Sequence, residues 1–294
     1  MSSVATAAAQ LRKYASLVRF SHSIFALPFA LQGAWLAARG MPALAKLCWI
    51  VLACVAARTA AMGFNRIVDR EIDARNPRTS ARELPAGKLT RGSVAALVIA
   101  SSALFLLAAF ELNPLCGKLA PAVLLVLLSY SWTKRFTWAC HLVLGLSLAL
   151  APLGAWLAVR GVIDSAAWIP GLLAAAVLTW VAGFDLIYAC QDAEFDRKAS
   201  LHSIPARFGL ARALQCSRAA HVATLIFLIG VWWQAELGWI YAVSIALAGL
   251  LLFIEQRLVR ADDLSRVNLA FFTLNGWIGL GLFVGLALDL RFAR

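Results

Sequence analysis

The chain has 294 residues, of which 62% are hydrophobic and only 14% are charged. Soluble domains are about 45–50% apolar and about 25% charged, so this composition excludes an ordinary soluble protein and indicates a membrane protein. The net charge of +12 does not indicate nucleic-acid binding, because the basic residues lie in loops between apolar segments and no basic soluble domain is present.

The apolar segments predict an all-α chain of nine membrane-spanning helices. A span needs about 20 mostly apolar residues. In chain order, the predicted spans are 22–38, 43–66, 93–112, 116–132, 139–159, 166–189, 217–235, 238–256 and 268–288. We expect residues 1–294 to form a single polytopic membrane domain.

The distribution of basic residues predicts how this chain is oriented. Most of the 27 Lys and Arg residues fall at the N-terminus and in every second loop, which all lie on one side of the membrane. Basic loops remain in the cytoplasm. We therefore expect the N-terminus and the long loops 67–92 and 190–216 on the cytoplasmic side of a bacterial inner membrane. An odd number of spans then places the C-terminus outside.

Acidic clusters end the second and the sixth predicted spans. Asn65, Asp69 and Asp73 follow one another at steps of four residues, and Asp192 and Asp196 repeat that spacing. Residues four apart on a continuing helix share one face. Ionisable residues at membrane depth are expensive and are functional candidates by default. The equivalent positions suggest two four-helix halves that bring their acidic clusters together, with a ninth helix added.

These carboxylates suit a metal ion that binds a diphosphate. Mg²⁺ prefers oxygen ligands and is usually held by one or two carboxylates together with substrate phosphate oxygens. For either cluster alone, a solvated helix end paired with nearby arginines would be the better interpretation. Two matching clusters favour the metal site instead. The predicted Mg²⁺ ligands are Asp69, Asp73, Asp192 and Asp196.

Longer motifs around these residues resemble the UbiA-type intramembrane prenyltransferases. The first is Asn65-Arg66-x-x-Asp69-x-x-x-Asp73 with Arg78-x-x-x-Arg82-x-Leu84-Pro85-x-Gly87; the second is Asp185-x-x-Tyr188-Ala189-x-Gln191-Asp192-x-x-x-Asp196; a shorter one is Tyr130-x-x-x-Lys134-Arg135. Within the family, residues 20–30 look most like 4-hydroxybenzoate polyprenyltransferases. Two departures are Arg66, where many members have Asp, and residues 202–205, where related sequences often have a Lys-Ser-Thr-like run.

The resemblance implies a fold and an activity. It implies nine transmembrane helices around a central cavity, capped by the two motif loops. It also implies Mg²⁺-dependent transfer of a polyprenyl group from an isoprenyl diphosphate to the ring of 4-hydroxybenzoate, in quinone biosynthesis within membrane lipid. Other acceptors stay open: a naphthoate, homogentisate, a tetrapyrrole or a lipid. A secondary transporter is less favoured, because its carboxylates would lie near mid-membrane.

Two buried ionisable residues complete the candidate site. Arg58 lies about two turns before Asn65, and a lone intramembrane arginine should face a cavity or a partner. It would either hold the carboxylate of an aromatic acid or pair with Asp185. Asp185 would orient the acceptor or accept its proton, unless it is only the structural partner of an arginine. The candidate substrate-binding residues are Asn65, Arg78, Arg82, Tyr130, Lys134, Tyr188 and His22; for His22 a structural role is at least as well supported.

Overall fold

The structure is a computed structural model that describes residues 13–18 and 26–293. Within those residues, eight helices are long and apolar enough to cross a membrane. They are α3 (Leu44–Val68), α5 (Arg91–Leu112), α6 (Pro114–Thr133), α7 (Cys140–Arg160), α8 (Trp168–Ala189), α11 (Leu210–Gln234), α12 (Trp239–Leu258) and α13 (Asn275–Phe292), the last preceded by the π-helical segment η4 (Leu269–Leu274).

The first predicted span is described only in part. Its counterpart α2 (Leu27–Ala38) is a 12-residue apolar helix, shorter than a membrane crossing requires. Residues 19–25, and with them the candidate residue His22, lie outside the described part of the chain. The count of nine crossings therefore stays a prediction, whereas the all-helical class and the eight later spans are confirmed for the described residues.

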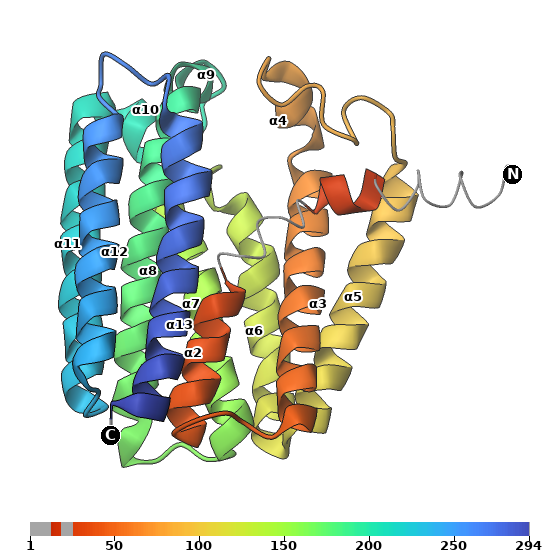
Figure 1. The fold of residues 1–294 in the computed structure, drawn as a ribbon. Coiled ribbons are helices and arrows are strands. Elements are labelled where there is room, and N and C mark those ends of the chain that lie inside the picture. Colours follow the sequence, from red (N-terminus) through yellow and green to blue (C-terminus); the bar gives the residue numbers. More distant parts are fainter. Residues whose placement is uncertain (1–12, 19–25, 294) are drawn as a thin grey trace, which may run out of the picture.

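The long helices form a bundle (Figure 1), and α8 is the most buried of them. Helix α8 packs on α7 and α11, while α3 packs mainly on α5, and α2 packs on α7. Side chains on all sides of α8 are buried, among them Val177, Trp180 and Val181. A helix that is apolar all round belongs in the interior of a bundle, which explains the position of α8. Helix α6 is the least buried of the long helices.

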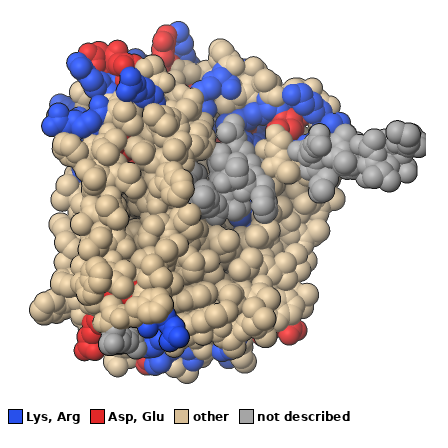
Figure 2. Space-filling model, viewed as in Figure 1, with Lys and Arg blue, Asp and Glu red and all other residues tan. Residues whose placement is uncertain are grey.

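Charged side chains gather at the two ends of the bundle (Figure 2). Between these ends, the visible face is covered almost entirely by uncharged residues. Hydrocarbon offers no hydrogen-bond partners, so a chain that crosses it must satisfy its backbone internally, as these helices do. The uncharged band and the helix lengths together fit a protein embedded in a membrane.

Both acidic motifs lie at one end of the bundle (Figure 1). The first lies where α3 meets the short helix α4 (Arg70–Arg75), and the second where α8 passes through the 3₁₀ turn η3 (Cys190–Asp192) into α9 (Ala193–Lys198). The prediction of one continuing helix per motif is therefore wrong in detail. Backbone hydrogen bonds still join Asp69 to the carbonyl of Asn65 and Asp73 to that of Asp69, at 2.9 and 2.8 Å, so the side chains keep successive turns.

A close approach of two backbones fixes α2 against α7. A Cβ atom added to Gly33 would lie 2.3 Å from the carbonyl oxygen of Pro152. We expect Gly33→Ala to destabilise the protein by about 1–3 kcal/mol, because the helices must separate. Thermal unfolding in detergent would measure this. Gly281→Ala is the matched control, since Gly281 is exposed and has no atom within 4 Å of such a Cβ. Equal melting temperatures for both variants would contradict the expectation.

Candidate active site

The first motif centres on a buried carboxylate at the joint of α3 and α4. Asp69 is only 3% exposed and forms ion pairs with Lys134 at 2.8 Å and Arg135 at 3.0 Å, both from the end of α6. The side-chain amide of Asn65 donates to the same carboxylate at 3.0 Å. A buried charge is costly unless it is paired and hydrogen-bonded. These cations therefore balance Asp69 in the structure.

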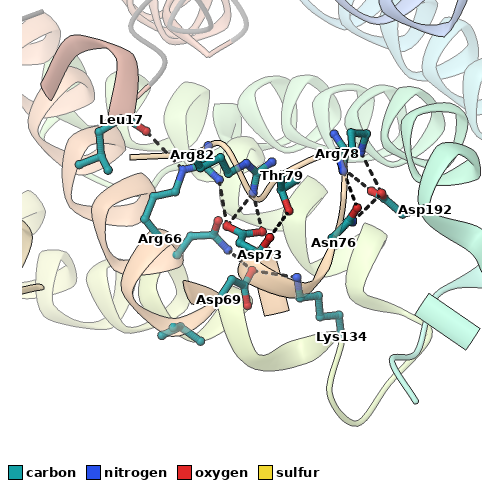
Figure 3. A network of polar contacts seen from close by, with 12 residues as sticks. Leu17, Arg66, Asp69, Asp73, Asn76, Arg78, Thr79, Arg82, Lys134 and Asp192 are labelled. Atoms are coloured by element: carbon teal, nitrogen blue, oxygen red, sulfur yellow. Dashed lines mark hydrogen bonds and ion pairs between the residues drawn. The ribbon is translucent and has the colours of Figure 1, made fainter. Parts of the chain in front are cut away.

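The second carboxylate of this motif is bound by the loop that follows α4. Asp73 is 4% exposed, and the Nη1 atom of Arg82 lies 2.8 Å from its Oδ1 atom. The hydroxyl of Thr79 donates to the backbone carbonyl of Asp73 at 3.0 Å. Arg66 lies 3.9 Å from the carboxylate. The loop is thus held directly over the end of the motif helix (Figure 3).

Arg78 connects the first motif loop to the second motif. Its Nε atom donates to Asp192 at 2.8 Å, and its Nη2 atom pairs with the other oxygen of that carboxylate (Figure 3). Its Nη1 atom donates to the hydroxyl of Tyr188 at 2.7 Å. The amide of Asn76 also donates to Asp192, at 3.0 Å. Burial alone would lower the pKa of Arg78, but these bonds to Asp192 and Tyr188 raise it above its ordinary value. Arg78 is therefore a permanent cation between the motifs.

The remaining aspartate faces a loop that contacts the end of α6. The hydroxyl of Ser203 donates to Asp196 at 2.9 Å, and the backbone N–H of His202 donates to the carbonyl of Lys134 at 2.7 Å. Neighbouring residues of one loop thus join the second motif to the residue whose side chain pairs with Asp69. The two motifs, far apart in sequence, become one connected polar site.

Asp185 is paired with a histidine. The Nδ1 atom of His141 lies 2.7 Å from the Asp185 carboxylate. The Nε2 atom of the same histidine accepts a hydrogen bond from the backbone N–H of Ile204 at 3.4 Å. The alternative of an Arg58–Asp185 ion pair is therefore wrong. The reason is the packing order of the helices, because α8 packs on α7, which carries His141, whereas α3, which carries Arg58, packs mainly on α5.

Arg58 instead lines an apolar cavity of about 460 Å³ between α3, α5, α6 and α7. Pockets for small ligands typically have about 300–1,000 Å³ and few polar groups. Among the described residues, Tyr130, Ser147 and two cysteines are the other polar residues that line it. The Nε atom of Arg58 is buried without a hydrogen-bond partner, and no carboxylate of the described residues pairs with its guanidinium.

The chemistry of the aspartates can be compared with that of a metal site. Among the described residues, no group of three or more His, Cys, Asp or Glu side chains is arranged to hold a metal ion. The carboxylates of both motifs contact Lys, Arg or hydroxyl groups instead. Carboxylate oxygens are nevertheless the ligands that Mg²⁺ prefers, and one or two suffice when phosphate oxygens complete the shell. The donor set fits Mg²⁺ that binds together with a phosphorylated ligand.

The structure brings most of the predicted residues together. Five of them contact the motif aspartates or one another: Asn65, Arg78, Arg82, Lys134 and Tyr188. Two others, Arg58 and Tyr130, line the cavity. Sequence reasoning missed four residues whose side chains contact these aspartates: Asn76, Arg135, His141 and Ser203. Arg135 directly follows Lys134 in a quoted motif and could have been found there, and Asn76 precedes Arg78 by two residues. Nothing in the local pattern connects His141 with Asp185.

Comparison with protein families and curated proteins gives consistent matches. The model of the UbiA prenyltransferase family matches residues 26–277. The 4-hydroxybenzoate octaprenyltransferase of Marinobacter nauticus is 31% identical over 289 residues, which cover 97% of this chain and 96% of the relative. The protein of that name from Nitrosomonas europaea is also 31% identical, over 293 residues and 98% of each chain.

Solved structures show the same fold. The apo structure of a UbiA homolog from Aeropyrum pernix K1 matches with a TM-score of 0.84 and 37% identity, covering 91% of this chain and 98% of that one. A UbiA homolog from Archaeoglobus fulgidus bound to GPP and Mg²⁺ matches with a TM-score of 0.70 and 21% identity, covering 94% and 99%. At that identity, the second likeness shows the fold alone.

Proposed function

Because the chain belongs to the UbiA prenyltransferase family, whose members transfer prenyl groups, we propose that it prenylates the ring of 4-hydroxybenzoate. The donor is a polyprenyl diphosphate, the reaction requires Mg²⁺, and the product enters quinone biosynthesis. The names of curated relatives that match over nearly the whole chain support this choice of acceptor. We also propose that residues 1–294 act as one domain.

One observation carries the choice of an acidic acceptor. The Nε atom of Arg58 is buried without a partner on the wall of an otherwise apolar cavity. A buried Nε–H group without a partner is costly, and a carboxylate ligand would remove that cost through charge-assisted hydrogen bonds to the guanidinium. The apolar wall would then enclose the ring that carries the carboxylate. A neutral acceptor such as a simple phenol would leave Arg58 unpaired.

The polar site between the motifs is proposed to bind the diphosphate. Asp69, Asp73, Asp192 and Asp196 would hold Mg²⁺. Lys134, Arg78 and Arg82 would exchange their present carboxylate partners for diphosphate oxygens, for which lysine and arginine are both suited. When bound, Mg²⁺ neutralises the negative charge that develops on the departing diphosphate.

Residues beside this site would complete the reaction. The bond between C1 of the donor and the diphosphate oxygen breaks, and a ring carbon next to the acceptor hydroxyl bonds to C1. The guanidinium of Arg78 lies 4.9 Å from the centroid of the Tyr188 ring, so this ring face already holds a cation. The allylic cation would take that place once Arg78 has moved to the diphosphate. The displaced ring proton passes to the Asp185 carboxylate, which His141 orients.

The distribution of basic residues and the position of the C-terminus support the proposed orientation in a bacterial inner membrane. Most of the basic residues fall at the N-terminus and in every second loop, both motif loops included, which favours the cytoplasmic side for these segments. Helix α13 ends at the opposite end of the bundle (Figure 1), in agreement with an external C-terminus. The membrane-bound donor would then present its diphosphate from the cytoplasmic leaflet, and the aromatic acid would reach the site from the cytoplasm.

A reconstituted assay tests the proposed function. Purified protein in liposomes would receive octaprenyl diphosphate and radiolabelled 4-hydroxybenzoate, and we expect a labelled lipid that EDTA abolishes and added Mg²⁺ restores. Labelled lipid from another acceptor alone would overturn the proposed substrate. Folded protein that consumes the donor equally well with and without EDTA would overturn the metal requirement.

A further inference from the structure

Helix α7 contains two internal glycines with different surroundings. A Cβ atom added to Gly145 would lie 2.4 Å from the carbonyl oxygen of Leu178, so the packing of α7 against α8 requires glycine there. At Gly154, no atom lies within 4 Å of such a Cβ. Glycine inside a helix destabilises it relative to alanine. Neighbouring residues therefore give no packing reason for glycine at position 154.

The space beside Gly154 belongs to the cavity that Arg58 lines. Helix α7 begins at Cys140, at the end of the bundle that carries the acidic motifs, and Gly154 lies about four turns further along this helix. Leu119 of the antiparallel helix α6, another lining residue, lies about four turns from the corresponding end at Thr133. Both residues therefore line the part of the cavity that is remote from the diphosphate site.

The walls in this remote part are apolar. They include Leu119, Leu157 and Phe105, and within the described part of the chain no charged residue lines the cavity except Arg58. The polar groups of an acceptor find no hydrogen-bond partner on such a surface. An isoprenoid tail is apolar along its whole length, so its transfer from water into an open apolar cavity is favourable. The donor tail is thus the ligand part that this region fits.

We propose that Gly154 keeps the remote part of the cavity open for the isoprenoid tail of the donor. The absence of a side chain at this position thereby lets the enzyme accept tails long enough to reach this depth. This inference rests on the proposed prenyl transfer, because it assigns the donor tail to the cavity. A larger side chain at position 154 would occupy the space itself. Short donors, which do not extend to this depth, would still fit.

The test compares two donors in wild-type protein and two variants. Gly154→Leu should lower kcat/KM for octaprenyl diphosphate at least tenfold more than kcat/KM for geranyl diphosphate, since small steric changes in an apolar pocket discriminate by 10- to 200-fold. Gly281→Leu is the matched control, because Gly281 is also exposed, has equally open space and does not line the cavity. It should leave the ratio between the donors unchanged.

Equal losses with both donors in folded Gly154→Leu protein would overturn the inference. If that variant does not fold, Gly154→Ala decides: it should raise the melting temperature of the ligand-free protein and still shift the ratio toward the short donor. An unchanged ratio there would likewise overturn the inference. Failure of wild-type protein to use either donor would instead overturn the proposed function, so the two failures are distinguishable.

Discussion

Asp192→Asn is expected to lower kcat for prenyl transfer about 100- to 1,000-fold, the usual effect of removing one group that stabilises developing charge. The carboxylate would no longer offer a charged oxygen to Mg²⁺, and Arg78 would lose its bidentate partner. Asp192 is a better position than Asp69 for this test, because Asp69 is more deeply buried and balances two cations. Initial rates with labelled acceptor would measure the effect.

The second motif contains its own control. Glu194 lies between the two aspartates in sequence, is exposed, and pairs only with Lys198, one turn away. Such surface pairs contribute little to stability. Glu194→Ala should therefore keep wild-type activity. Full activity of folded Asp192→Asn protein would show that Asp192 holds no essential metal ion.

Arg58→Met is expected to raise KM for 4-hydroxybenzoate about 10- to 100-fold, since hydrogen bonds to a charged group contribute about 1.5–3 kcal/mol. The same variant should melt at a higher temperature than wild-type protein without ligand, because methionine removes a partly buried guanidinium whose Nε atom is buried without a partner. A residue kept for stability would show the opposite change. Thermal unfolding and acceptor titration measure the two effects separately.

A conservative variant and a second acceptor make this prediction specific. Arg58→Lys keeps the charge and loses the planar fork, so its KM should lie between those of wild type and Arg58→Met. Activity on phenol, which lacks the carboxylate, should be nearly the same in all three proteins. An unchanged KM for 4-hydroxybenzoate in Arg58→Met would contradict the role of Arg58 in acceptor binding.

The local pattern of the chain was sufficient to identify the elements and most of the site. Apolar segments long enough to cross a membrane predicted the helices, because hydrocarbon leaves a chain no other way to satisfy its backbone. Spacing of four residues predicted that Asp69 and Asp73 lie on successive turns, and the structure shows this even though the helix breaks between them. The charges beside the aspartates also predicted the basic surroundings of the site.

The pairing of residues across helices depended on the tertiary structure. From the sequence, a role for Arg58 in holding the acceptor carboxylate and an Arg58–Asp185 ion pair were equally plausible. Helix packing places Asp185 beside His141 and leaves Arg58 on the wall of a cavity. Likewise, only the folded loops bring Arg78 of the first motif to Asp192 of the second.

The physical reason is the range of the forces that act on each level of structure. Helix formation and membrane insertion depend on residues close in sequence, so composition and hydropathy determined the class of this protein and the approximate positions of its spans, although α11 begins seven residues before the predicted 217. The contact between α7 and α8, and the cavity beside Gly154, depend on which side chains let two helices approach. The tertiary structure alone decided those contacts, and with them the partner of Asp185 and the space available to a ligand.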